Sequence, residues 1–373
     1  MTVLPRPLPL PEFPWNTLVP AQERAKSHPG GLVDLSVGTP VDSSPRVARE
    51  ALCAAADAPG YPLTVGTTAV RAAICGWFSR RRGVELTPAQ VIPTIGSKEA
   101  VALLPLLLGA GAGDTVLHPE MAYPTYDVGA RLAGARPVPV GDDPVEWPAA
   151  EMVWLNSPGN PHGHVLDVAQ LRAIVAWARE YGAVVVSDEC YAELAWEVDD
   201  VPSLLDPRVT DGDLTGLVAL YSLSKQSSLA GYRAAMMAGD AAVLAAVVEG
   251  RKHLGMLVPA PVQAALVAAL NDDEHVDVQR EVYRRRRDVL KPAVEAAGVE
   301  VDPASRAGLY LWGRVPGLNG RELVDRFAEL GILVAPGDFY GDKAVDYVRI
   351  ALTASDERID AAVERLAGVR FSG

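Results

Sequence analysis

The chain has few cysteines, no long apolar run and no excess of positive charge. Its three cysteines, in 373 residues, show no metal-like spacing and offer no disulfide framework, a pattern that favours a reducing, cytoplasmic location. The longest apolar run, residues 101–113, is far shorter than a membrane span and contains Pro105. A net charge of −13 argues against the basic surface that nucleic acid or an anionic membrane requires. We therefore expect a cytoplasmic protein with neither of these partners.

Apolar residues, by contrast, are abundant. The chain is 49% hydrophobic and 22% charged, which is ample for one large domain and a smaller one. Prolines at positions 5, 7, 9, 11 and 14 predict an extended arm over the first forty residues, which joins either the small domain or a subunit interface. We expect the arm and part of the small domain in residues 1–45, the large domain in 46–275, and a linking helix with the rest of the small domain in 276–373.

Short apolar runs alternate with helical patterns from about residue 46. Four runs, starting at 115, 152, 183 and 217, are continuous, which is typical of strands buried on both faces of a parallel sheet. A fifth run starts at 235. One intervening helix is expected over 167–182, with Asp167 as N-cap and Gly182 as the stop. This order predicts an α/β fold with helices on both faces of the sheet and a ligand beyond the carboxyl ends of the strands.

The last third of the chain predicts a different arrangement. One long helix is expected over residues 261–298, broken near Pro292. A smaller α+β unit should follow over 299–373, with strands around 308–315 and 345–352.

Reactive side chains follow three of the predicted strands. Asp188 ends the run that starts at 183, and Tyr191 comes three residues later. Asn160 lies in the turn-rich loop after the run at 152, and Lys225 follows the run at 217. Each can have a simpler role, since Asp188 suits a helix N-cap or an ion pair and Asn160 suits a turn. Together they would bring an acid, an amide and a lysine to one edge of the sheet.

A phosphate site is predicted from a second group of residues. Gly96 and Ser97 stand directly before a strongly apolar helix, whose free backbone N–H groups are suited to bind an anion. Ser222 and Arg233 could add a hydroxyl and a bidentate cation.

Pyridoxal phosphate accounts for these residues together. It needs a lysine for its aldehyde, an acid for its ring nitrogen, donors for its phenolate oxygen, an aromatic ring to lie against and a phosphate pocket. The aromatic candidates are Tyr123, after another predicted strand, and Tyr61, in a glycine-containing loop. The sequence thus predicts that Lys225 meets the aldehyde of this cofactor.

These residues stand in motifs that resemble the class I/II aminotransferases of fold type I over essentially the whole chain. The motifs are N-P-x-G at 160–163, D-x-x-Y at 188–191, and S-x-S-K at 222–225 with an arginine eight residues on. The resemblance implies a large domain with a mostly parallel seven-stranded sheet and a smaller α+β domain. It also implies amino-acid and keto-acid substrates, and a homodimer that shares its active sites.

The resemblance further implies a role for each cofactor-binding residue. Lys225 would condense with the cofactor aldehyde and, once released by substrate, carry the α-proton. Asp188 would keep the ring nitrogen protonated, while Tyr191 and Asn160 would bind the 3-oxygen. The other implied contacts are Ser97, the amide of Lys98, Ser222, Ser224 and Arg233 at the phosphate, Tyr123 on the ring, and Tyr61 from the partner subunit.

Two more residues match the family's carboxylate site. Arg349 would clamp the substrate α-carboxylate, because a planar guanidinium suits that group. Gly38, in S-V-G-T-P, would bring its backbone close to the same carboxylate, and Asn160 is also expected near the substrate. The chain departs from the family's pattern at His162, which replaces a threonine, and after Arg233, where alanine replaces glycine; both changes concern local packing.

Three longer segments predict the substrate. Residues 10–42, 94–100 and 119–135 resemble actinobacterial N-succinyldiaminopimelate aminotransferases of lysine and diaminopimelate biosynthesis, which use glutamate as amino donor. The G-S-K-E segment also resembles LL-diaminopimelate aminotransferases, and by analogy Lys98 contacts a distal substrate carboxylate, unless it is only a solvated first-turn residue. The alternatives are an LL-diaminopimelate or other amino-acid aminotransferase, or a C–S lyase of the same fold and cofactor.

Overall fold

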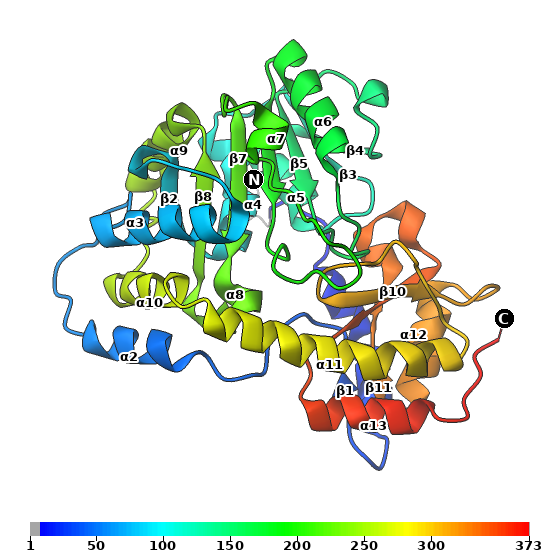
Figure 1. The fold of residues 1–373 in the computed structure, drawn as a ribbon. Coiled ribbons are helices and arrows are strands. Elements are labelled where there is room, and N and C mark those ends of the chain that lie inside the picture. The colour runs from blue at the N-terminus through cyan, green and yellow to red at the C-terminus, as the bar shows by residue number, and fades with distance from the viewer. Residues whose placement is uncertain (1–7, 373) are drawn as a thin grey trace, which may run out of the picture.

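A seven-stranded sheet forms the centre of the larger part of the molecule (Figure 1). The computed structural model describes residues 8–372. In spatial order the strands are β2 Val91–Ile95, β8 Ala234–Gly239, β7 Leu217–Ser222, β6 Val184–Asp188, β5 Met152–Asn156, β3 Thr115–Pro119 and β4 Arg136–Val140. Among these seven, β8 alone runs against its neighbours. The mostly parallel sheet predicted from the sequence is confirmed.

Helices cover both faces of this sheet. One face carries α3 Thr68–Trp77, α6 Val168–Tyr181 and α10 Ala260–Leu270, and the other carries α4 Gly96–Leu107, α5 Thr125–Ala133 and α9 Ala241–His253. In β6, Val185 packs with the helices of the first face and Val186 packs with those of the second. Because successive side chains of a strand point to opposite faces, a strand covered twice reads as an unbroken apolar run. The predicted Asp167 cap and Gly182 stop of α6 are both present.

A second, smaller unit contains an antiparallel sheet. Its strands are β12 Ala335–Pro336, β13 Tyr347–Ala351, β10 Tyr310–Arg314 and β9 Glu300–Val301. The N-terminal strand β1 Val33–Asp34 pairs with β11 Ile332–Leu333, and the helices of the unit are α1 Val19–Lys26, α12 Gly320–Glu329 and α13 Asp356–Leu366. The fold is therefore the predicted pairing of α/β and α+β parts, while the domain boundaries at residues 45 and 275 stay a prediction.

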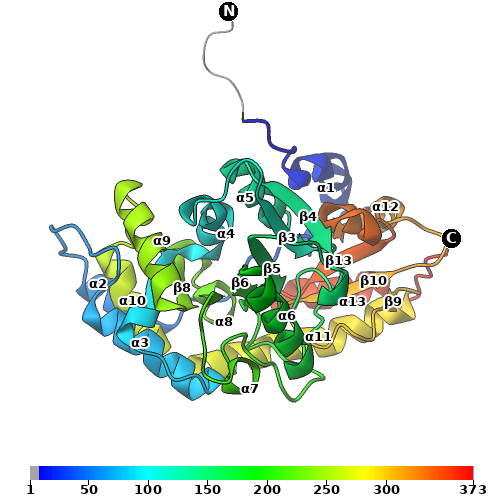
Figure 2. The same cartoon turned by 90° about the horizontal axis from the view of Figure 1, so that it is seen from above.

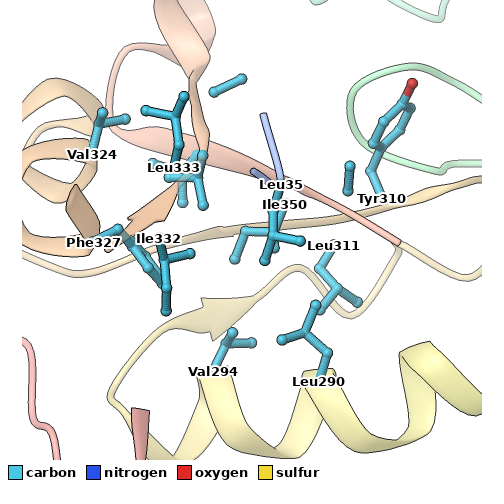
Figure 3. Close-up of a cluster of buried hydrophobic side chains, with 14 of the residues drawn as sticks. Leu35, Leu290, Val294, Tyr310, Leu311, Val324, Phe327, Ile332, Leu333 and Ile350 are labelled. Carbon is cyan, nitrogen blue, oxygen red and sulfur yellow. The ribbon is translucent and has the colours of Figure 1, made fainter. Parts of the chain in front are cut away.

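The helix α11 Glu274–Ala296 runs along both units (Figures 1 and 2). At one end it contacts the short helix α8 Leu223–Gln226, which follows β7, and further along it contacts α13 and β9. Figure 3 shows Leu290 and Val294 of α11 pointing toward Leu311 and Ile350 in the core of the smaller unit. No helix within residues 8–372 is long and apolar enough to cross a bilayer.

The predicted single helix over 261–298 was wrong. The chain leaves helical structure between α10 and α11, at residues 271–273, and α11 continues through Pro292. An N–H at position 292 would have bonded the carbonyl of Asp288, and both residues are exposed. Water can therefore satisfy that carbonyl, and the proline does not end the helix.

The predicted extended arm was also wrong from Pro14 onward. A short 3₁₀ helix, Pro14–Leu18, leads directly into α1, and a proline stands in the first turn of each. Proline is tolerated there because the N–H groups of a first turn have no intrahelical partner. Prolines 5 and 7 lie outside the described residues. The helix α2 Arg46–Ala54 then leads into the larger unit.

Candidate active site

Five parallel strands end at one edge of the large sheet, and each is followed by candidate residues. They are Ser97 after β2, Tyr123 after β3, Asn160 after β5, Asp188 and Tyr191 at and after β6, and Lys225 after β7. Because β8 runs in the opposite direction, the residue just before it, Arg233, comes to the same edge. There Ala234 pairs with Ile95 at the end of β2. The topology thus brings six separate segments of the large sheet together.

A cavity of about 480 Å³ lies at this edge. The predicted residues that line it are Gly38, Ser97, Lys98, Tyr123, Asn160, Asp188, Tyr191, Ser222, Ser224, Lys225, Arg233 and Arg349. Tyr61 is the exception: it is 95% exposed and does not line this cavity, so its contact with a partner's site stays a prediction. Residues that the sequence did not single out also line the cavity, among them Phe13, Trp15, Tyr126, Cys190 and Tyr310.

Asp188 is a buried carboxylate in this cavity. One of its oxygens accepts the Tyr126 hydroxyl at 3.0 Å, and the other accepts the backbone N–H of Cys190 at 3.2 Å. Burial raises the pKa of the carboxyl, and the hydrogen bonds from Cys190 and Tyr126 lower it in part. The two donors thus favour the ionised form, which is the form that can pair with a cationic ring nitrogen.

Lys225 is the candidate nucleophile and base. The Ser222 side chain caps α8 by accepting the N–H of Ser224 at 3.2 Å, and this short turn presents Lys225 to the cavity. The ammonium donates a hydrogen bond to the carbonyl oxygen of Gly38. Burial lowers the pKa of the amine, although the Tyr310 phenol partly opposes that shift. An amine whose pKa is lowered in this way is neutral, and hence reactive, at lower pH than an exposed lysine.

An anion site lies between the start of α4 and Arg233. The helix begins at Gly96, whose φ is +72°, and a Cβ at that position would overlap the Arg233 guanidinium. Glycine therefore lets this cation reach the backbone at the helix N-terminus. The hydroxyl of Ser222 lies 2.9 Å from that of Ser224. Free N–H groups, two hydroxyls and a guanidinium make a suitable donor set for phosphate.

Arg349, on β13, lines the cavity from the smaller unit. Its Nη1 donates to the Asn160 side chain at 3.0 Å, and its Nη2 donates to the carbonyl of Ser36 at 2.6 Å. Its Nε is buried without a hydrogen-bond partner among the described residues. The guanidinium carbon lies 3.9 Å from the centre of the Tyr310 ring, which is a close cation–π contact. Because these partners are neutral, the positive charge remains available to a carboxylate ligand.

The hydroxyls of Tyr191 and Tyr310 lie 3.2 Å apart. Burial raises the pKa of Tyr191 well above its usual value. Burial also raises the pKa of Tyr310, but the cations Arg349 and Lys225 outweigh that effect and the net pKa is lowered. Tyr310 is thus the more acidic phenol, and Tyr191 is the natural donor between them.

The N-terminal segment contributes aromatic rings to the cavity. The Lys98 ammonium nitrogen lies 5.4 Å from the centre of the Phe13 ring and 5.7 Å from that of Tyr123. The centre of the Trp15 ring lies 5.9 Å from the guanidinium carbon of Arg349. We call Phe13, Trp15, Lys98 and Tyr123 the arm patch. It combines aromatic surface with a cation that faces rings rather than a carboxylate.

Some of the cavity residues that were not predicted have a signal in the local sequence, and others have none. Tyr126 follows Tyr123 by three residues, and its ring packs edge-to-face against that of Tyr123 with the ring centres 6.1 Å apart, so its place beside a candidate residue was a usable signal. Tyr310 lies in a predicted strand, but nothing local to that strand indicates contact with Arg349. Phe13 lies in the proline-rich stretch that was interpreted as an extended arm.

Comparison with known proteins identifies the family. The family model for aminotransferase class I and II matches residues 31–366. The chain is a class I/II aminotransferase. It has the fold-type I architecture, and the cofactor of the family is pyridoxal phosphate.

Two relatives are similar over most of their length. The chain is 55% identical over 359 residues to the 4-dedimethylamino-4-oxo-anhydrotetracycline transaminase OxyQ of Streptomyces rimosus, covering 96% of this chain and 99% of that one. It is 54% identical over 359 residues to a probable aminotransferase of Mycobacterium tuberculosis, with 96% and 85% covered. A solved structure, a probable N-succinyldiaminopimelate aminotransferase from Thermus thermophilus, is 31% identical with a TM-score of 0.85, covering 95% of this chain and 99% of that one.

The chemistry of the cavity fits this cofactor. Gly96, at a positive φ, leaves space for Arg233 beside the free N–H groups of α4, which suits a phosphate. Asp188 is a buried acid for a ring nitrogen, and Lys225 is a partly buried amine for an aldehyde. The contact that each residue makes with the cofactor stays a prediction.

Proposed function

We propose that this aminotransferase is an N-succinyl-LL-2,6-diaminopimelate:2-oxoglutarate aminotransferase of lysine and diaminopimelate biosynthesis, with glutamate as amino donor. The observation that carries the proposal is that the cavity contains a further cation, Lys98, besides Lys225, Arg233 and Arg349. Arg349 suits the α-carboxylate at the reacting end, and Lys98 faces two aromatic rings in the arm patch, where a distal carboxylate would find a partner. The similarity to the Thermus structure supports the same substrate class.

Side chains at different positions in the cavity have different proposed roles. Pyridoxal phosphate, when bound, supplies a ring that withdraws electrons from the substrate α-carbon. Arg349 would hold the α-carboxylate, and Asp188 would stabilise positive charge on the ring nitrogen. The Lys225 amine would take the α-proton of the donor in one half-reaction and give a proton to the α-carbon derived from the keto acid in the other. The arm patch covers the substrate and limits the entry of water. Because the enzyme retains the amino group between the two half-reactions, the kinetics should be ping-pong.

The substrate assignment is tested by running the reaction in reverse, with 2-oxoglutarate as amino acceptor, and measuring the glutamate that forms. The amino donors to compare are N-succinyl-LL-diaminopimelate, free LL-diaminopimelate, aspartate and an aromatic amino acid. The proposal expects the succinylated donor to have the highest kcat/KM. Lys98→Gln should reduce that value by about 10- to 150-fold, the range of one hydrogen bond to a charged group, while Lys98→Arg retains most of it. A kcat/KM for the succinylated donor that does not change in Lys98→Gln would rule out this role for Lys98.

A second candidate substrate is a polycyclic ketone. Two observations favour it: the 55% identity to the tetracycline-pathway transaminase, and the aromatic surface of Phe13 and Trp15 in the arm patch. For such a substrate, Trp15→Ala should reduce turnover with 4-dedimethylamino-4-oxo-anhydrotetracycline more than Lys98→Gln does. The reverse order of effects, with the succinylated donor preferred, supports the first proposal.

The proposal includes a homodimer with shared active sites. Tyr61 is 95% exposed and Leu63 60% exposed on one loop, an apolar projection that a second copy could cover. Lys225→Ala and Tyr61→Ala should each be weakly active or inactive alone. Refolded together, they should recover activity, because one site of each mixed dimer then holds both wild-type residues. If the mixture recovers no activity although mixed dimers form, the sites are not shared.

A further inference from the structure

The segment from residue 36 to residue 42, here called the substrate loop, connects the smaller unit to the larger one. It leaves β1 and leads to α2. The carbonyl of Ser36 accepts Nη2 of Arg349 at 2.6 Å, and the carbonyl of Val37 accepts the Thr353 hydroxyl at 2.9 Å. The first half of the loop is therefore fixed to the smaller unit.

Gly38, in the middle of the loop, lies directly against the reactive groups. Its carbonyl accepts the Lys225 ammonium, and a Cβ at this position would overlap the Tyr310 hydroxyl. A small displacement of the loop would therefore change the position of a backbone group that contacts Lys225.

Asp42 fixes the far end of the loop through a bidentate ion pair with Arg286. Its carboxylate accepts Nη1 of Arg286 at 2.8 Å and Nη2 at 2.6 Å, and it also accepts the Gln279 amide at 3.0 Å. Arg286 is only 3% exposed. It belongs to a run of four arginines at 284–287, a pattern typical of a solvated helix face, so its burial is a feature that the local sequence does not indicate.

The same face of α11 also contacts the backbone of the catalytic lysine. Gln279, Tyr283 and Arg286 are spaced by four and three residues and so share one side of the helix. The Tyr283 hydroxyl donates to the carbonyl of Lys225 at 3.2 Å. One helix face therefore holds the end of the substrate loop and the residue that the loop approaches.

We infer that the Asp42–Arg286 pair is a positioning device, which holds the end of the substrate loop and so keeps the Gly38 carbonyl within hydrogen-bonding distance of the Lys225 amine. Through the loop, the pair sets the affinity for the amino-acid substrate. Neither side chain lines the cavity, so both act through the loop. The effect on substrate affinity rests on the proposed function, because it requires the substrate carboxylate to lie at Gly38. The effect on the loop itself depends only on the structure.

The second carboxylate that pairs with Arg286, that of Asp356, provides the control. Nε of Arg286 donates to Asp356 at 2.6 Å, and Asp356 stands in the first turn of α13, outside the loop. Asp42→Asn and Asp356→Asn thus make the same chemical change to two carboxylates of one arginine. A role limited to general stability predicts changes in the free energy of unfolding with the KM unchanged in both variants, whereas a positioning role predicts a raised KM in Asp42→Asn alone.

The two variants are compared in steady-state transamination from glutamate. Asp42→Asn should raise the KM for glutamate about tenfold or more, the scale of one charge-assisted hydrogen bond, with kcat changed less than about threefold. Asp356→Asn should leave both within about twofold. Equal KM values for the two variants, or a loss confined to kcat, would overturn the inference. Gln279→Met removes a single donor to Asp42 and should shift KM in the same direction by less, which provides a second test if Asp42→Asn does not fold.

Hydrogen exchange on the cofactor-free protein separates this inference from the proposed function. Backbone amides of residues 36–42 should exchange about tenfold or more faster in Asp42→Asn than in Asp356→Asn. If no amino acid is a substrate but this difference appears, the proposed function fails and the loop role stands. If exchange is the same in both variants, the positioning role fails whatever the activity.

Discussion

Replacing Tyr126 by phenylalanine removes one of the two donors to Asp188. The Tyr126 hydroxyl bonds that carboxylate at 3.0 Å, and both groups are buried. A hydrogen bond to a charged group contributes about 1.5–3 kcal/mol, and about 1.4 kcal/mol corresponds to one pKa unit. We therefore expect the pKa of Asp188, which burial already raises, to rise further when this donor is lost. A less ionised Asp188 pairs less well with a cationic ring nitrogen.

The expected result is that Tyr126→Phe binds pyridoxal phosphate about 10- to 150-fold more weakly than wild type. The measurement is a titration of cofactor-free protein, followed by visible absorbance, at several pH values. Tyr221→Phe is the control, because it makes the same change at a buried tyrosine whose hydroxyl donates to the neutral Gln226 side chain at 2.6 Å. If both variants bind the cofactor equally well, Tyr126 does not act through Asp188 and the reasoning is refuted.

Three further changes probe other parts of the molecule. Arg349→Lys keeps the charge but loses the planar fork, so the KM for glutamate should rise about 10- to 100-fold in steady-state assays, and an unchanged KM would contradict the carboxylate role. Gly96→Ala places a Cβ against the Arg233 guanidinium at a positive φ, so the cofactor should be lost on dialysis; full retention would argue against the phosphate site. Phe327→Ala empties a fully buried position in the smaller unit and should cost about 3–5 kcal/mol in denaturant unfolding, whereas a loss below about 1 kcal/mol would indicate that the core collapses around the change.

The catalytic edge of the sheet could be predicted because local sequence carries both parts of the argument. Unbroken apolar runs mark doubly covered strands, and parallel strands place their carboxyl ends together. The runs that end at Asp188 and Ser222 belong to the neighbouring strands β6 and β7. The acid and the lysine therefore had to lie near each other once both strands were recognised.

The two strands that the sequence did not reveal are the edge strands of that sheet. β2 contains Pro93, and β4 contains Pro137 and Pro139. Proline is normally a sign against a strand, but at an edge the missing N–H faces away from the neighbouring strand. These segments become strands because of where the fold places them, and that information is not local.

Long-range ion pairs were beyond prediction for a similar reason. Arg286 is separated from Asp42 by 244 residues, and the arginines beside it in sequence give the pattern of a solvated face. Trp15 and Arg349 are likewise far apart in sequence, and they lie close together because the 3₁₀ helix Pro14–Leu18 and β13 pack in one unit. Local patterns place residues on elements, whereas contacts between elements depend on the packing of the whole chain.

Cofactor-free protein should reveal the buried state of Lys225 through the pH dependence of its stability. Burial holds the pKa of this amine below its usual value of 10.5 in the folded state. Between that lowered pKa and about 10.5, the unfolded chain binds more protons at Lys225 than the folded one does. The free energy of unfolding contributed by this residue therefore increases as pH rises through the window, and it is lost as pH falls through the folded pKa.

Lys225→Met isolates this contribution, because it removes the titrating group and keeps a side chain of similar length. The quantity to measure is the free energy of unfolding of wild type minus that of the variant, from urea titrations between about pH 7 and pH 10.5. We expect the difference to move in favour of wild type as pH rises, by about 1.4 kcal/mol for each unit by which the pKa is lowered. A difference that stays constant would mean that Lys225 titrates like an exposed lysine. In that case burial would not account for a reactive amine at neutral pH, and another group would have to accept the α-proton.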